Sequence, residues 1–210
     1  MADNYLGRKM EEYEAQKCAS VRTRRVSLVS LLTKNRSTRG FDVSFKVRKD
    51  QLVSLVEAAR LAPSAMNQQA LRYRLVTEEE ASLLLPHIRL GTALPDMKLP
   101  LEGTEPNAFV VVCSTKEGRF VDVDMGIAAQ TILLRAVEMG LNGVCIAAFD
   151  PEAVQKVLNL SLTPQLLIAV GRSAERVEVV DIVEGDSQTY YRKNGIHFVP
   201  KLRCEELIIK

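Results

Sequence analysis

The chain has 210 residues, of which 47% are hydrophobic and 26% are charged, so it can bury a sizeable core and is not intrinsically disordered. Its longest unbroken apolar run, residues 108–113, is far too short to span a membrane. A formal net charge of +2 does not indicate nucleic acid as a partner, but residues 17–39 hold seven basic side chains and no acidic one, so any anion-binding function should involve that segment.

The first half of the chain is marked by apolar side chains at helical spacing. The pattern predicts a charged helix within about the first twenty residues and an amphipathic helix over residues 26–34. A third helix is predicted over residues 52–59 and should stop near Pro63, because proline cannot continue it. Residues 72–76 alternate and fit a strand. The first helix has few apolar positions, so we expect it to pack on another surface, and we take residues 1–24 as an extension.

The second half alternates strands with helices. Residues 108–113 read as a strand buried on both faces, and the strongest helix of the chain follows, capped by Asp122 or Asp124 and stopped by Gly140. Its small side chains would allow another helix to approach closely, as in an interface. The apolar stripe of this helix is Met125, Ala128, Ala129, Ile132, Leu133 and Ala136.

Two further strands and one more helix are expected after that long helix. Strands are predicted over residues 144–148 and 165–170, with a helix over residues 152–158 whose cap is the Asp150-Pro151 pair. The apolar end, residues 207–209, reads as a strand that needs an edge to pair with, such as one on another subunit. Helices early and mixed elements later indicate an α+β domain.

Several kinds of chemistry have no motif in this sequence. There is no GxGxxG or GxxxxGK[ST] for nucleotides, no GxSxG elbow and no HExxH, and the two histidines have no metal-ligand spacing. The four cysteines lie far apart without a CxxC pair, and the first ten residues lack the apolar core of a signal peptide, so we expect reduced thiols in the cytoplasm. An enzyme of this kind would draw its chemistry from a cofactor.

Three short segments remain as candidate binding elements. Arg36, Ser37 and Arg39 suit a phosphate, although a basic helix end that offsets the helix dipole would look the same. Asn67 and Gln69 offer amide donors and acceptors suited to the edge of a planar heterocycle, or belong to an ordinary helix-ending loop. The third segment holds Lys201 and Arg203, for which a charged tail is the common explanation.

Taken in order, these segments resemble the FMN-dependent nitroreductase family. The family's RRSxRxF-like, PSxxNxQP-like and GLxG…GFD-like elements have counterparts in NRSTRGF (35–41), PSAMNQQA (63–70) and GLNGVCIAAFD (140–150), and PKLR (200–203) is similar to a late phosphate-binding element. The resemblance covers residues 25–210, as one FMN-binding domain. It implies an α+β three-layer sandwich, with a mainly antiparallel central sheet flanked by helices, in an intertwined homodimer.

The resemblance also implies a role for each matched residue. The phosphate and ribityl chain of a tightly bound FMN would be held by Arg36, Ser37, Arg39, Lys201 and Arg203. Its ring would contact Pro63, Ser64, Asn67 and Gln69, and a backbone N–H of Ala147 or Ala148 would face flavin N5. FMN would lie at the subunit interface, the apolar tail would pair with the partner's sheet, and the small-residue helix would join the contact.

Three positions depart from the family pattern. The first arginine of the family's motif is Asn35 here, which removes or moves one phosphate contact, and the proline after NxQ is Ala70. Ala147 stands where an acidic residue or glycine is common, so only backbone chemistry is available there. These differences bear on flavin affinity and substrate choice more than on the fold.

The leading functional hypothesis is a ping-pong oxidoreductase. NAD(P)H would reduce the flavin at N5 and leave, and an electron-poor acceptor such as a nitroaromatic or quinone would take its place. One alternative is a flavin-binding storage or flavin-modifying protein of the same fold without reductase turnover. A second alternative is a nucleic-acid or anionic-surface binder that uses residues 17–39, although only 5% of residues are aromatic and stacking platforms are scarce.

Overall fold

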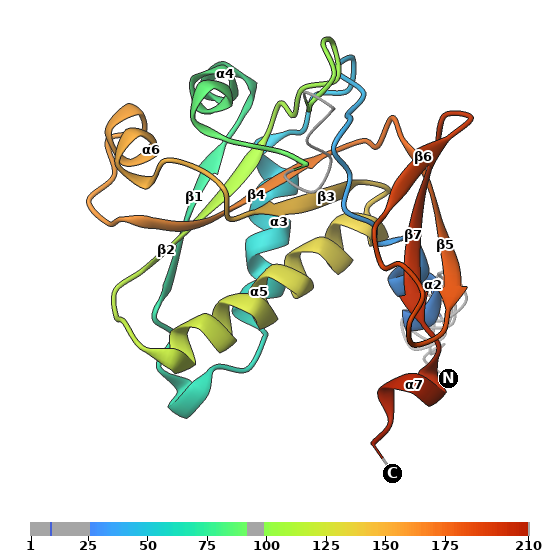
Figure 1. Cartoon of the computed structure of the whole chain (residues 1–210). Helices are drawn as coiled ribbons and strands as arrows, with labels where there is room; N and C mark the ends of the chain where they lie inside the picture. Colours follow the sequence, from blue (N-terminus) through green and yellow to red (C-terminus); the bar gives the residue numbers. More distant parts are fainter. Residues whose placement is uncertain (1–8, 10–25, 92–98, 210) are drawn as a thin grey trace, which may run out of the picture.

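The computed structural model describes residue 9 and residues 26–91 and 99–209 (Figure 1). The helix predicted within the first twenty residues, and Arg22, Arg24 and Arg25, therefore lie outside the described residues, Lys9 excepted. No helix in the described ranges is both long and apolar enough to cross a lipid bilayer.

The centre of the fold is a four-stranded antiparallel sheet. Its order is β1 (Leu71–Val76), β2 (Phe109–Ser114), β4 (Pro164–Gly171) and β3 (Asn142–Ile146), so β3 forms one edge. The inner strands β2 and β4 are almost wholly buried, which explains their continuous apolar sequence. All four strands match segments that the sequence predicts.

Helices cover both faces of this sheet and make three layers (Figure 1). On one face lie α3 (Lys49–Arg60) and α5 (Arg119–Glu138), which pack on each other; on the other lie α4 (Glu78–Leu84) and α6 (Pro151–Val157). The first pair shares a core with alternate β2 side chains such as Val110. The second pair shares a separate core with the remaining β2 side chains. The predicted sandwich is confirmed.

A second, three-stranded sheet stands beside the first. Its order is β5 (Arg176–Ile182), β7 (Ile196–Leu202) and β6 (Tyr191–Lys193), with β5 and β7 parallel. The short helix α2 (Leu28–Lys34) lies next to this sheet (Figure 1), and its Leu32 lines the cavity described below. No strand of this sheet was predicted from the sequence, where residues 200–203 were interpreted either as a charged tail or as a late phosphate-binding element.

Two local predictions are wrong. Helix α5 begins after Gly118 rather than at Asp122 or Asp124, and both aspartates lie inside it. Residues 207–209 do not form a strand in this chain, because Leu207 ends the short helix α7 (Cys204–Leu207) and the last described residues are exposed. Pairing of this tail with another subunit stays a prediction.

Other local signals are confirmed. Asp150 caps α6 by accepting a hydrogen bond from the backbone N–H of Ala153 at 3.0 Å. Gly140 has a φ of 75° and stops α5, and the N–H of Leu141 then donates to the carbonyl of Ala136 at 2.8 Å. The contact at Gly140 and Leu141 lies directly before β3, which borders the candidate site.

Candidate functional site

A cavity of about 390 Å³ lies between the two sheets, and we call it the anion pocket. It brings together residues from the segment after α2 and residues from β7, although the two segments are far apart in the chain. The polar residues that matter here are Arg36, Ser37, Arg39, Tyr190, His197 and Lys201. Four of the five residues predicted to hold a phosphate therefore share one cavity.

The segment after α2 is held against the edge strand β3. Ser37 forms an isolated parallel bridge with Gly143, and the N–H of Thr38 donates to the carbonyl of Gly143 at 3.1 Å. Thr38 is fully buried. A Cβ on Gly143 would lie 2.4 Å from the carbonyl oxygen of Ala169, so only glycine allows this close approach.

Arg36 is anchored at one end and unpaired at the other. Its Nη2 donates to the carbonyl of Leu32 at 2.7 Å, at the end of α2. Its Nε is buried and has no hydrogen-bond partner. A buried guanidinium N–H without an acceptor is costly, so an anion in this cavity would satisfy it.

Arg39 is oriented by both its backbone and its side chain. Its backbone N–H donates to Glu175 Oε2 at 2.6 Å, and its guanidinium lies 5.0 Å from the ring centre of Tyr190. Its Nη1 also donates to the carbonyl of Ser37 at 3.3 Å. Glu175 accepts a second hydrogen bond from Arg192, so both of its carboxylate oxygens are engaged.

In β7, the face toward the anion pocket is set by strand alternation. His197, Val199 and Lys201 are spaced two residues apart and all line the cavity. Arg203 lies beyond the strand, where its N–H donates to the carbonyl of Ile182 at 3.0 Å, and it is not among the lining residues. Of the two basic residues predicted from PKLR, only Lys201 reaches this cavity.

The second predicted segment borders a different cavity of about 250 Å³, which we call the amide-loop pocket. Pro63, Ser64 and Gln69 line it together with residues of α3 and α5. Asn67 lies in the one-turn helix η1 (Ala65–Asn67), and its Oδ1 accepts a hydrogen bond from Gln69 Nε2 at 3.1 Å. The two predicted amides therefore lie together, paired with each other.

The loop over residues 64–69, which we call the amide loop, has a strained backbone that a buried carboxylate supports. Met66, Asn67 and Gln69 have φ values of 52°, 51° and 47°, a region that non-glycine residues seldom adopt. Asp124 Oδ1 accepts from the N–H of Ala65 at 2.9 Å, and Asp124 is 5% exposed. The aspartate predicted as a helix cap thus holds the loop of the second cavity instead.

Of the two alanines predicted to face a flavin N5, Ala147 has the open backbone N–H. The carbonyl of Gly143 points outward, toward Thr38. Carbonyls alternate in direction along a strand, and Ile146 is three residues further on, so its carbonyl points inward to β4. In a trans peptide the next N–H points the opposite way, so the N–H of Ala147 faces out from the sheet edge.

The backbone carbonyl of Ala148 is already hydrogen-bonded. Its carbonyl accepts from the N–H of Arg89 at 2.8 Å, and it lines a third cavity of about 430 Å³ with residues 86–89 and Phe149. Ala148 is half-buried, whereas Ala147 is exposed. The structure therefore favours Ala147 as the donor at this strand end.

Helix α5 separates the anion pocket from the amide-loop pocket. Gln130 and Leu133 border the first, and Asp124 and Ala128 border the second. Because an α-helix turns by about 100° per residue, the two pairs lie on roughly opposite sides of α5. In one chain, the predicted phosphate and ring contacts are therefore not parts of one cavity.

Sequence reasoning missed His197 and Tyr190. Their rings lie 5.1 Å apart between centres, and His197 is 3% exposed with a buried Nδ1 that has no partner. Burial lowers the pKa of His197 below its usual 6.5; the charges of Arg39 and Arg192 lower it further, and Glu175 opposes them. Had β7 been recognised, period-two spacing back from Lys201 would have placed His197 on the same face.

The fold and the cavities define an α+β protein with a basic site at a sheet edge, and comparison with known proteins agrees. The model described as "Nitroreductase family" matches residues 32–106 and 104–172. The chain belongs to the nitroreductase family.

Solved structures of that family share the fold. A nitroreductase family protein from Streptococcus pneumoniae TIGR4 is 20% identical, with a TM-score of 0.62 over 88% of this chain and 100% of that one. An FMN-dependent nitroreductase from Clostridium difficile R20291 is 25% identical, with a TM-score of 0.56 over 71% and 89%. A Methanocaldococcus jannaschii protein assigned as a nitroreductase is 35% identical over 57 residues, only 27% of this chain and 29% of that protein.

Proposed function

We propose that the protein is an FMN-dependent oxidoreductase that passes reducing equivalents from NAD(P)H to an electron-poor acceptor such as a nitroaromatic or quinone. The observation that supports it most is the meeting of Arg36, Ser37, Arg39 and Lys201 in the anion pocket. The donor set fits a phosphate monoester, and a bound phosphate would give the unpaired Nε of Arg36 an acceptor. The similar protein named as FMN-dependent supports the same cofactor.

Each part of the chain would then have a defined task. The guanidinium and ammonium groups of the anion pocket hold the phosphate, and the N–H of Ala147 donates to the ring edge, where it stabilises negative charge. Bound FMN supplies the two-electron chemistry that no side chain of this protein provides. Because both substrates would use the same flavin in turn, no separate nucleotide motif is needed.

The separation of the two cavities supports a site built from two subunits. The anion pocket and the amide loop of one chain lie on roughly opposite sides of α5, so we expect that a single FMN would not contact both within one chain. In a homodimer, the amide loop that holds Asn67 and Gln69 would come from the partner and complete the ring contacts, with FMN at the interface.

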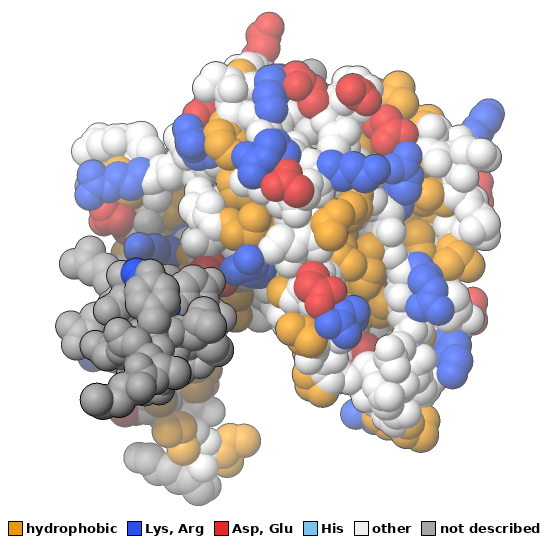
Figure 2. Space-filling view, turned by 180° about the vertical axis from the view of Figure 1, so that it is seen from behind, with side chains coloured by type: hydrophobic (Ala, Val, Ile, Leu, Met, Phe, Trp, Pro, Cys, Tyr) orange, Lys and Arg blue, Asp and Glu red, His pale blue; other side chains and the backbone are white. Residues whose placement is uncertain are grey.

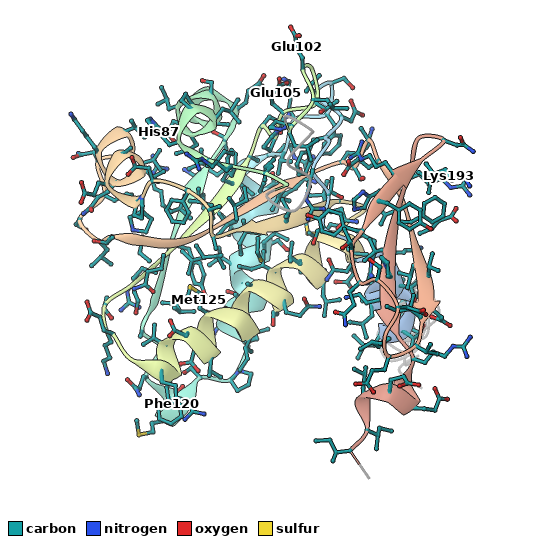
Figure 3. All side chains as sticks on the ribbon, in the orientation of Figure 1. His87, Glu102, Glu105, Phe120, Met125 and Lys193 are labelled. Carbon is teal, nitrogen blue, oxygen red and sulfur yellow. The ribbon has the colours of Figure 1, made fainter. Side chains whose placement is uncertain are left out.

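The outer face of α5 offers a surface for the second copy. Phe120, Val123 and Ile127 are 57%, 50% and 37% exposed, and Gln130 and Leu134 continue their alternating spacing of three and four residues. That spacing forms one stripe suited to another helix. Figure 3 shows Phe120 on the side of α5 away from the sheet, whereas Met125 lies between α5 and the sheet.

We expect Ile127→Glu to dissociate this dimer and to weaken FMN binding with it. A charge buried without a partner should weaken association by about 3 kcal/mol, more than about 100-fold. Sedimentation equilibrium measures the association constant. Val157→Glu is the matched control, because Val157 on α6 is equally exposed at 37% but lies on the opposite face of the sheet. A dimer that persists in Ile127→Glu would place the interface elsewhere.

Flavin binding is the direct test of the proposed function. Purified protein should bind FMN, quench its fluorescence and show the absorption of oxidised flavin, and it should then oxidise NAD(P)H with a quinone. Protein that neither contains nor binds FMN would contradict the proposal. Flavin binding without NAD(P)H oxidation would instead favour the storage or flavin-modifying alternative.

The nucleic-acid alternative has less support. The two arginines at the end of residues 17–39 line a cavity of about 390 Å³, whereas Lys17, Arg22, Arg24 and Arg25 lie outside the described residues. Figure 2 shows Lys and Arg side chains mixed with acidic and hydrophobic ones on the face that it displays. Strong, salt-dependent binding of DNA would revive this alternative.

A further inference from the structure

His197 is a buried titratable group in the anion pocket to which the proposed function assigns no role. His197 is 3% exposed, and its Nδ1 is buried without a hydrogen-bond partner. It lines the cavity together with Val199 and Lys201 of the same strand. A native structure seldom leaves a buried imidazole nitrogen unpaired. His197 lines the anion pocket, whose other polar groups suit an anion, and it also borders a smaller cavity of about 100 Å³ beside Glu175 and Arg192.

The charged groups around His197 come from every neighbouring element. They are Arg36 and Arg39 after α2, Glu175 before β5, Arg176 on β5, Arg192 on β6 and Lys201 on β7, with the hydroxyl-bearing ring of Tyr190 alongside. Glu175 is the only acidic group among them, and both of its oxygens already accept hydrogen bonds from Arg39 and Arg192. The surroundings of the imidazole are therefore cationic until an anion enters.

We propose that His197 takes up a proton when a phosphate group enters the anion pocket and then donates a hydrogen bond to it, so that FMN affinity depends on pH. The proposal rests on the proposed function for the identity of the ligand, but its chemistry applies to any tetrahedral dianion. A dianion offsets the positive field of the neighbouring guanidinium groups, and this makes the imidazolium form favourable.

The direction of the pH effect follows from linkage. In the empty pocket the pKa of His197 is lowered from its usual 6.5. The proposal requires a higher pKa in the complex, because the dianion favours the imidazolium. Between those two pKa values, binding takes up one proton, so affinity falls by up to about tenfold for each unit of rising pH. Below both values and above both values, this group adds no pH dependence.

Histidine NMR tests proton uptake directly, because the chain contains only two histidines. The pH midpoint of each imidazole is measured without and with inorganic sulfate, a tetrahedral dianion that does not titrate in this range. We expect sulfate to raise the midpoint of His197 and to leave His87 unchanged. The variants His197→Asn and His87→Asn assign the two signals, and either one suffices. An unchanged His197 midpoint at saturating sulfate would overturn the proposal.

Flavin binding gives a second measurement. The ratio of FMN affinities of the wild type and His197→Asn should fall toward high pH, whereas the same ratio for riboflavin, which has no phosphate, should not change. The second ionisation of the FMN phosphate, near pH 6, cancels in this ratio. A ratio for FMN that stays constant with pH would contradict the proposal.

The two proposals can fail separately. A sulfate-dependent midpoint in a protein that binds no FMN would overturn the proposed function and support the role of His197. FMN binding with an unchanged His197 midpoint and a constant affinity ratio would support the proposed function and overturn the role of His197.

Discussion

Arg39→Ala is expected to lower FMN affinity by about 10- to 150-fold, because a hydrogen bond to a charged group contributes about 1.5–3 kcal/mol. The backbone N–H of Arg39, not its side chain, bonds Glu175, so the segment should stay in place when the guanidinium is removed. The loss should therefore come from the missing phosphate contact. Fluorescence quenching of FMN, with riboflavin as the ligand that lacks a phosphate, measures it.

Arg48→Ala is the matched control for this prediction. Arg48 precedes α3, is 65% exposed, pairs with Asp50 and is not among the residues lining the anion pocket, so its replacement should leave FMN affinity within about twofold. Equal losses for FMN and riboflavin in Arg39→Ala would mean that the side chain supports the fold rather than the phosphate. An unchanged FMN affinity would remove Arg39 from the site.

Local signals predicted the central sheet because each depends on neighbours in the chain. The continuous apolar run of β2 needs burial on both faces, and the apolar side chains of α3 need one covered face. The Asp150-Pro151 pair and Gly140 act within a few residues of themselves. Such signals are visible in a single sequence, and β2, α3, the start of α6 and the end of α5 lie where they were predicted.

The second sheet was not predicted, although the sequence holds one local signal for it. Strands β6 and β7 are joined by Asn194-Gly195, a pair typical of tight hairpin turns, with φ values of 51° and 75°. Residues of β5 are half-buried or exposed throughout and do not alternate regularly, so neither an apolar run nor a clean alternation marks the strand. Its parallel partner is β7, which begins fourteen residues after β5 ends, and parallel pairing leaves no hairpin turn to recognise. Without β7, the sequence showed Lys201 and Arg203 as a basic pair, and it gave no reason to separate them.

The candidate site was predicted in parts, and tertiary contacts decide how the parts relate. Asp124 is a good cap residue by type, but a contact with Ala65, fifty-nine residues earlier, determines its position. The placement of α5 between the two cavities is equally invisible in the sequence. The roles of the matched residues toward FMN remain predictions. A site built from two chains would allow one FMN to contact both the predicted phosphate residues and the predicted ring residues.

Glu175→Ala is expected to lower the free energy of unfolding by about 3 kcal/mol, the lower end of the range for breaking a buried ion pair. Glu175 is 10% exposed and its partner Arg192 is 25% exposed, so the variant leaves a largely buried guanidinium without its carboxylate. The N–H of Arg39 loses its acceptor as well, so FMN affinity should fall together with stability. Urea denaturation at one fixed protein concentration measures the first effect.

Glu178→Ala provides the comparison, because Glu178 and Arg176 form an ion pair on the same strand whose side chains are 40% and 72% exposed. Removing that exposed pair should cost less than about 1 kcal/mol. The double variant Glu175→Ala with Arg192→Ala should lose less than the two single changes together, since neither charge is then left unpaired. Additive losses, or a Glu175→Ala effect no larger than that of Glu178→Ala, would mean that Glu175 does not hold Arg39 and Arg192 in place beside the anion pocket.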